Sequence, residues 1–178
     1  MKKNPRNGLA LTLMAAAALT AGCATASKPD DMVATPPTLV RHNSGSVSVQ
    51  VSGGRDTSAM GASQISNDAF AQALSDSIRK SGLFGSVTAG GANYKLDAFI
   101  GKVDQPMFGF SMTVKMEVSY TLVDTRSGTT VWQKDISSQY TAHPSDAFAG
   151  VTRLRLANEG AARENIRQAL ADMSTLSL

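Results

Sequence analysis

Residues 110–122 read FSMTVKMEVSYTL, and this stretch decides the fold. Apolar side chains occupy every second position from Phe110 to Leu122, with polar or charged residues between them. Unbroken alternation predicts a long strand with one buried face, because successive side chains of a strand point to opposite faces. A half-buried strand of this kind belongs to an antiparallel or mixed sheet that is covered on one side.

Shorter runs of the same kind lie on both sides of this strand. The turn residues Asp124–Gly128 separate it from a further alternating run, Thr130–Tyr140, and the pair predicts a hairpin. Earlier in the chain, Ser46–Val51 and Tyr94–Ile100 also alternate, and Leu83–Val87 is a short apolar run. We therefore expect a sheet of about five strands.

Two segments have the spacing of helices. Phe70, Leu74 and Ile78 recur every four residues, and Gly82 provides a typical C-terminal stop. A second helix is expected over residues 148–173. The resulting order, β-α-β-β-β-β-α, predicts an α+β fold in which a single mixed or antiparallel sheet of about five strands packs against two helices.

The first 22 residues have the pattern of an export signal. A basic start is followed by an uncharged run, residues 8–22, that is too short to span a bilayer and has the length of a signal-peptide core. Three of the 17 basic residues lie in this segment, so 14 basic and 14 acidic residues remain after it. Because the remaining chain has no net charge, we expect no binding of nucleic acid.

The signal segment ends at the only cysteine. Thr20-Ala21-Gly22-Cys23 resembles a bacterial lipobox, which implies that Cys23 becomes the first mature residue and carries the lipid. Ala24 after it implies, by the sorting known for enteric lipoproteins, a place in the outer membrane. An ordinary cleaved signal beside a chance cysteine is the alternative. A single cysteine excludes an intrachain disulfide in an exported protein.

The chain is expected to have three parts. Residues 1–22 are a lipoprotein signal peptide, and residues 23–44 are the lipidated cysteine followed by a flexible tether rich in proline and small polar residues. Residues 45–178 form a single periplasmic α+β domain.

The residues that carry chemistry are sparse. His42 lies in the expected tether, and His143 lies in a loop three residues before Asp146. The sequence contains none of the common zinc, calcium, nucleotide or nucleophile motifs. Met112 and Met116 are expected in the core rather than at a copper site. We expect no enzyme activity, no cofactor and no metal.

Two groups of residues are candidates for binding a partner. Met107, Phe108 and Phe110 flank the turn before the long strand, where they form an exposed contact for a partner or a membrane, or fold back over the sheet edge.

The second group is charged and lies on the last helix. Arg155, Glu159 and Arg163 recur every four residues, and Arg155 and Glu159 project near the apolar side of the helix. Either the regular helix starts after about Asn158, or a polar network is buried there, and a subunit or partner interface is the other interpretation.

Three longer stretches resemble a known group of envelope proteins. The helix and strand over Phe70–Val87 are similar to a unit in the amino-terminal domain of TolB and in CsgG-like lipoproteins such as PelC and LpoB, and the hairpin Tyr120–Trp132 recurs in the same group. Together with the tail Arg153–Ile166, they make the chain resemble a family of small proteobacterial lipoproteins. This resemblance implies a small proteobacterial lipoprotein with binding, oligomerisation or accessory roles in envelope transport. LptE, a tethered sheet with two helices, is a second resemblance.

The leading functional hypothesis is a lipid-anchored outer-membrane protein that faces the periplasm. It would act as an accessory or scaffold by binding an envelope protein or copies of itself. The alternative is a periplasmic carrier or sensor that holds a lipid or glycan between sheet and helices, which requires a large apolar cavity. A hydrolase would need a cleft that gathers His143, an acid and a nucleophile.

Overall fold

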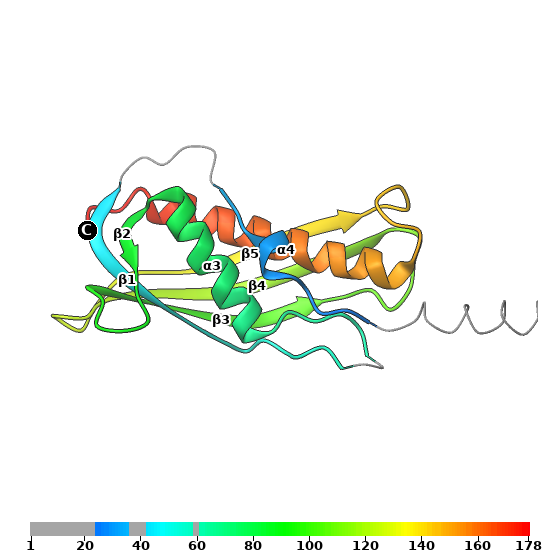
Figure 1. Ribbon diagram of the computed structural model, residues 1–178, viewed down its shortest axis with the longest axis horizontal. Helices are drawn as coiled ribbons and strands as arrows, with labels where there is room; N and C mark the ends of the chain where they lie inside the picture. The colour runs from blue at the N-terminus through cyan, green and yellow to red at the C-terminus, as the bar shows by residue number, and fades with distance from the viewer. Residues whose placement is uncertain (1–23, 36–41, 59–60) are drawn as a thin grey trace, which may run out of the picture.

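The computed structural model describes residues 24–35, 42–58 and 61–178. One open sheet carries two long helices on the same face (Figure 1). This arrangement confirms the predicted α+β fold of five strands and two covering helices, and one additional short helix precedes the sheet. The elements, in chain order, are α2 (Pro29–Met32), β1 (Asn43–Ser52), α3 (Asn67–Ser81), β2 (Phe84–Val87), β3 (Tyr94–Asp104), β4 (Met112–Asp124), β5 (Thr129–Ala142) and α4 (Gly150–Met173).

The sheet is mixed and has the strand order β2-β1-β3-β4-β5. β1 pairs in parallel with β2 on one side and with β3 on the other, whereas β3, β4 and β5 are antiparallel neighbours. Val87 of β2 and Tyr94 of β3 both pair with Val47, so the link 88–93 carries the chain from one side of β1 to the other. β5 therefore lies at one edge of the sheet and the short β2 at the opposite edge.

The long alternating stretch forms β4, between β3 and β5. Its apolar side chains are buried beneath the helices, whereas the polar residues between them are exposed or half-buried on the opposite face. The strand begins at Met112, two residues later than the alternation predicts, because Phe110 belongs to the exposed turn before it. The apolar face consists of Met112, Val114, Met116, Val118, Tyr120 and Leu122.

Helix α3 is defined by its ends as well as by its apolar face. The hydroxyl of Ser66 accepts a hydrogen bond from the main-chain N–H of Ala69 at 3.2 Å, which caps the first turn. Gly82 follows the last turn at a φ of +65°, a left-handed conformation that glycine adopts without steric cost. The side chains of Phe70 and Leu74 are fully buried against the sheet.

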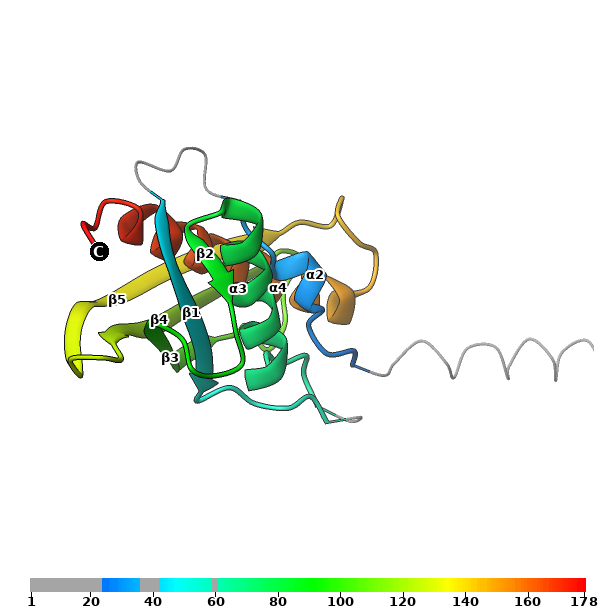
Figure 2. The same ribbon diagram turned by 60° about the vertical axis from the view of Figure 1, so that its left-hand side comes forward.

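Helix α4 packs closely because its buried face consists largely of small residues. Ala157, Ala161, Ala162 and Ala169 have no exposed surface, and Figure 2 shows the helix lying over β4 and β5. Small side chains at these positions allow the helix backbone to approach the sheet. The larger buried side chains of the helix are Leu154, Ile166, Leu170 and Met173.

A polar contact joins α4 to the centre of this core. The hydroxyl of Tyr120 donates a hydrogen bond to Oδ1 of Asn165 at 2.8 Å, and both residues are fully buried. Nδ2 of Asn165 donates in turn to the carbonyl of Ile136 at 2.8 Å. Burial raises the pKa of the Tyr120 hydroxyl far above its ordinary value, so the phenol is held in its neutral form.

Candidate functional site

The prediction of a flexible tether is wrong for residues 24–35. In this segment Met32 has no exposed surface and Ala34 is 2% exposed, because both join the core and α2 packs against α3 and α4. The main-chain N–H of Ser27 donates to the carbonyl of Gln64 at 3.2 Å. This segment contains small and polar residues and one proline, a composition typical of linkers, but here those residues form the short helix α2 and its flanks.

Two more main-chain hydrogen bonds hold the same segment to side chains of the domain. The N–H of Lys28 donates to Oε1 of Glu159 at 2.9 Å, and the N–H of Ala34 donates to the hydroxyl of Ser77 at 2.9 Å. Residues 24–35 are therefore held from two helices at once. Since β1 begins at Asn43, the folded part also starts before the predicted boundary at residue 45.

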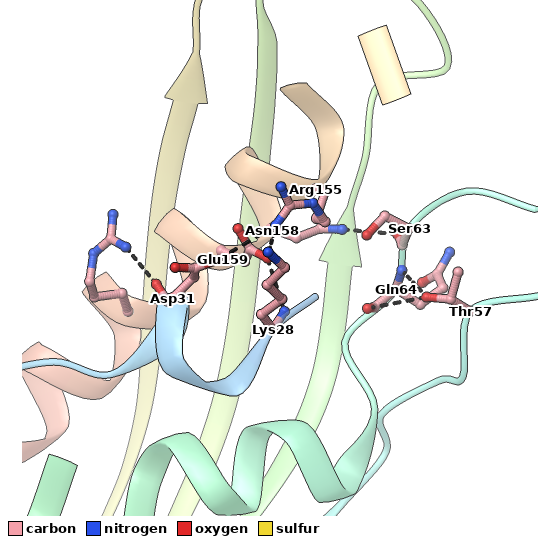
Figure 3. A network of polar contacts seen from close by, with 9 residues as sticks. Lys28, Asp31, Thr57, Ser63, Gln64, Arg155, Asn158 and Glu159 are labelled. Atoms are coloured by element: carbon pink, nitrogen blue, oxygen red, sulfur yellow. Dashed lines mark hydrogen bonds and ion pairs between the residues drawn. The ribbon is translucent and has the colours of Figure 1, made fainter. Parts of the chain in front are cut away.

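Figure 3 shows the charged network that receives this segment. Glu159 is 1% exposed and pairs with Nη1 of Arg155 at 2.7 Å, and the same Nη1 lies 3.6 Å from the carboxylate of Asp31. Nη1 of Arg163 donates to the main-chain carbonyl of Asp31 at 2.6 Å. The carboxylate and both guanidinium groups thus bind one segment of their own chain.

This arrangement decides between the two interpretations of the helix start. α4 is regular from Gly150 onward, so the polar residues are buried as a network rather than left outside the helix. Arg155, Glu159 and Arg163 contact residues 24–35, and their predicted role in binding a partner stays a prediction. Arg163 also lies over the ring of Tyr140, with 5.8 Å between its guanidinium carbon and the ring centroid.

A second set of polar contacts extends the network to the end of β3. Asn158 is fully buried and donates through Nδ2 to the carbonyl of Ser63 at 2.9 Å. Nε2 of Gln105 donates to the same carbonyl and to Oδ1 of Asn158, each at 2.8 Å. Nε2 of Gln64 lies 3.3 Å from Oε1 of Gln105. The N-terminal segment, the loop before α3 and the end of β3 therefore meet at one place.

Large apolar side chains are exposed close to this place. The side chains of Met107, Phe108 and Phe110 are 93%, 85% and 87% exposed, so they do not fold back over the sheet edge. Phe148, in the loop before α4, is fully exposed as well. The sequence carries no signal for Phe148, because a helix that starts at residue 148 places it five turns before Ile166, on the apolar face. The helix starts at Gly150 instead, so Phe148 lies in the loop.

His143 contacts Ser111 and Asp146, but these three residues do not form a catalytic triad. Nδ1 of His143 lies 3.2 Å from the hydroxyl of Ser111. The carboxylate of Asp146 accepts from the main-chain N–H of His143 at 2.7 Å, not from its ring. A nucleophile is activated when its base is oriented through the ring by a third group, and this carboxylate is used as a turn cap instead.

The layer between sheet and helices is filled by side chains. Phe70, Leu74, Tyr120, Ile166 and Leu170 are all fully buried there. A groove of about 510 Å³ lies instead beside β4 and β5, and polar residues line most of it, among them Lys115, Glu117, Ser137, Gln139, Glu164 and Gln168. A packed interior does not favour the carrier hypothesis, which requires a large apolar cavity.

Two further features of the described ranges bear on function. Among these residues, none of the helices is both long and apolar enough to cross a membrane. No group of three or more histidine, cysteine or acidic side chains within the same ranges could hold a metal ion. Met112 and Met116 lie in the core, at 7% and 0% exposure. Cys23, the predicted lipidation site, lies outside the described residues.

Comparison with known proteins yields matches only among solved structures. No family model matches the chain, and no curated protein matches it. A protein of Xanthomonas campestris from the family DUF330 is 12% identical with a TM-score of 0.67, over 85% of this chain and 95% of that one. A candidate lipoprotein of Caulobacter crescentus is 18% identical with a TM-score of 0.53, over 72% and 88%.

A third similar structure is the PelC dodecamer of Paraburkholderia phytofirmans. It is 13% identical with a TM-score of 0.50, and the match covers 82% of this chain and 96% of that one. Similarities at this level of identity show that the chain shares an α+β fold with small proteins of this kind, which include PelC and a candidate lipoprotein.

Proposed function

We propose that this chain is an outer-membrane lipoprotein anchored through Cys23, with its α+β domain in the periplasm. It acts without enzymatic activity, as an accessory or scaffold protein that binds an envelope protein or copies of itself. The observation that carries this proposal is the docking of residues 24–35 on the domain, which fixes the start of the mature chain directly to the folded part.

The docked segment limits the distance between domain and membrane. Ser27 is held by Gln64, and it follows Cys23 by only four residues, which span at most about 14 Å when fully extended. Several acyl chains on one cysteine anchor a protein stably, because each buried CH₂ group contributes about 0.8 kcal/mol. A protein built in this way works at the membrane surface rather than at the end of a long tether.

The shared fold supports the class of function. A candidate lipoprotein of Caulobacter crescentus and the PelC dodecamer have the same α+β architecture. The dodecamer supports the self-association part of the proposal. The edge strand β5 is a suitable interface between copies, since an edge strand can extend its sheet by pairing with another chain.

The first experiment tests anchoring. Cells that express the full chain are grown with radiolabelled palmitate, and their membranes are separated on a density gradient. The expected result is labelled protein in the outer-membrane fraction, with Cys23→Ala unlabelled and absent from that fraction. Wild-type protein that is unlabelled, or that remains soluble in the periplasm, would contradict the proposed lipid anchor.

The second experiment tests self-association. Native mass spectrometry of the detergent-solubilised mature protein gives its stoichiometry directly. A discrete closed oligomer supports a scaffold built from copies of this chain. A monomer would mean that the partner is a different envelope protein, which crosslinking in intact cells would identify.

A further inference from the structure

Four exposed apolar side chains form what we call the apolar tip: Met107, Phe108, Phe110 and Phe148. Each of them exposes more than four-fifths of its surface. Exposed apolar patches of this kind usually mark a surface that contacts another protein or a membrane. The tip is made by two loops, 105–111 between β3 and β4 and 143–149 between β5 and α4.

Hydrogen bonds hold the two loops together as one surface. The hydroxyl of Ser111 lies 3.2 Å from Nδ1 of His143, and behind this contact Met112 of β4 pairs with Ala142 of β5. Nη1 of Arg153 donates to the carbonyl of Phe148 at 2.7 Å, which ties the second loop to the start of α4. The loops lie at the same end of the molecule in Figures 1 and 2.

The chain enters the domain at this same end. Ser27 is bonded to the carbonyl of Gln64, the side chain of Gln64 lies 3.3 Å from that of Gln105, and Gln105 precedes Met107 by two residues. Figure 1 shows the blue N-terminal segment leaving the domain at the end of the molecule that carries the two loops. Because Cys23 precedes Ser27 by four residues, a lipid on Cys23 would be attached no more than about 14 Å from this end of the domain.

We infer that the apolar tip inserts into the interface of the phospholipid leaflet that holds the lipid anchor. This inference rests on the proposed lipidation of Cys23, and it adds a second membrane contact that fixes how the domain stands on the bilayer. Phenylalanine side chains suit this position, because segments that lie in the membrane interface bury Trp, Phe and Leu at the boundary between headgroups and acyl chains. The sheet then stands with the tip at the membrane and the β4–β5 hairpin away from it.

The charge of the two loops fits a lipid surface. Residues 105–111 carry no charged side chain, and the only carboxylate in residues 143–149 is that of Asp146. That carboxylate already accepts a hydrogen bond from the main-chain N–H of His143. Insertion of the four apolar side chains therefore requires little desolvation of charge, which would otherwise oppose entry into the bilayer.

The test places a fluorescent reporter in the tip. The lipidated mature protein is reconstituted into phosphatidylethanolamine and phosphatidylglycerol vesicles, with and without bromine on the acyl chains. The chain has a single tryptophan, Trp132, which pairs with Leu122 near the hairpin at the opposite end of the sheet. The variant Phe108→Trp in a Trp132→Phe background carries the reporter, and the wild-type chain provides the distant reference.

The expected result is severalfold loss of emission from the indole at position 108 in brominated vesicles, with little change for Trp132. Phe99→Trp in the same Trp132→Phe background is the matched control, because Phe99 is an exposed aromatic residue on β3 and faces away from the helices. Its emission should also be insensitive to bromine. Phe110→Trp provides a second reporter in the tip.

Three outcomes would overturn the inference, and they are distinguishable. Protein that floats with the vesicles but is not quenched at position 108, and stays open to an aqueous quencher, has its tip in water. Protection from the aqueous quencher without quenching by bromine means that another copy of the chain covers the tip. Protein that does not float with the vesicles contradicts the lipid anchor as well, and so the proposed function.

Discussion

The main-chain N–H of Lys28 donates a hydrogen bond to the carboxylate of Glu159, 2.9 Å away and 131 positions later in the chain. The bond joins the segment that follows the predicted anchor to the middle of the last helix. Glu159 is almost completely buried and also pairs with Arg155 at 2.7 Å. Residues 24–35 are thus part of the fold, and the proposed lipid on Cys23 would hold the domain close to the membrane.

The first prediction concerns Glu159. Glu159→Ala leaves the guanidinium of Arg155 without its close partner in a largely buried position, and we expect a loss of about 3 kcal/mol in the free energy of unfolding. Denaturant unfolding measures this loss. Hydrogen exchange of residues 24–35 should become faster in the variant, because the N–H of Lys28 loses its acceptor.

The matched control for this change is Glu164→Ala on the same helix. Glu164 pairs with Arg167 at 2.7 Å, but about a third of each side chain is exposed, and Arg167 holds the pKa of that carboxyl below its usual value. Its removal should cost less than about 1 kcal/mol, as is typical of exposed pairs. Equal losses in the free energy of unfolding for the two variants would mean that the buried pair of Glu159 stabilises the protein no more than an exposed pair does.

The second prediction tests whether α2 belongs to the core. Met32→Ala empties a fully buried site where α2 packs against α3 and α4, and the expected loss in the free energy of unfolding is about 2 kcal/mol or more. Asp30→Ala, at an exposed position of the same short helix, should change the free energy of unfolding by no more than about 0.5 kcal/mol. If Met32→Ala were as stable as the control, residues 24–35 would be a tether after all.

The third prediction concerns the hydrogen bond between Tyr120 and Asn165. Tyr120→Phe leaves Oδ1 of a buried amide without its donor, and the expected cost is about 1–2 kcal/mol. Tyr94→Phe removes a hydroxyl from a partly exposed tyrosine and should cost clearly less. Urea unfolding of the three proteins measures the difference. A neutral Tyr120→Phe would show that Asn165 finds another donor.

A pH dependence follows from the same residue. Burial raises the pKa of Tyr120 above its ordinary value of 10.0, so above that pH the unfolded chain loses a proton that the folded chain keeps. The stability associated with this residue is complete below pH 10.0 and falls as the pH rises above it, by about 1.4 kcal/mol per pH unit. Comparing wild type with Tyr120→Phe at about pH 9 and about pH 11 isolates the effect. Parallel losses in both proteins would contradict it.

The fourth prediction concerns the closest approach of α4 to β5. A Cβ added at Gly160 would overlap the ring of Tyr140. Gly160→Ala should therefore destabilise the protein by about 1–3 kcal/mol, although alanine favours a helix by about 1 kcal/mol. The double variant with Tyr140→Ala should lose less than the sum of the two single variants, since the overlap is then removed. A more stable Gly160→Ala would show that the ring moves without cost.

Local patterns predicted the sheet and the helices well. The alternation from Phe110 to Leu122 and the spacing of Phe70, Leu74 and Ile78 depend only on neighbouring residues, and each element formed close to its predicted range. The boundary of β4 differs because Phe110 continues the alternation past the end of the strand. The alternation alone does not distinguish an apolar residue that is exposed in a turn from one that is buried in the core.

The docked N-terminal segment could not be predicted in this way. Its partners, Gln64, Ser77 and Glu159, lie far along the chain, and nothing local distinguishes residues 24–35 from an ordinary polar linker. Charged residues near the apolar side of the last helix did indicate a buried network. The sequence left open what fills it, because the partner is a main-chain N–H that every non-proline residue possesses.

The central claim is that a lipid on Cys23 anchors the chain directly beside its folded domain. Intact-mass spectrometry of the protein extracted from outer membranes of expressing cells tests this claim most directly. We expect a chain that begins at Cys23 and carries the added mass of the diacylglycerol and acyl groups of a bacterial lipoprotein. A chain that begins at another residue, or an unmodified Cys23, would contradict it.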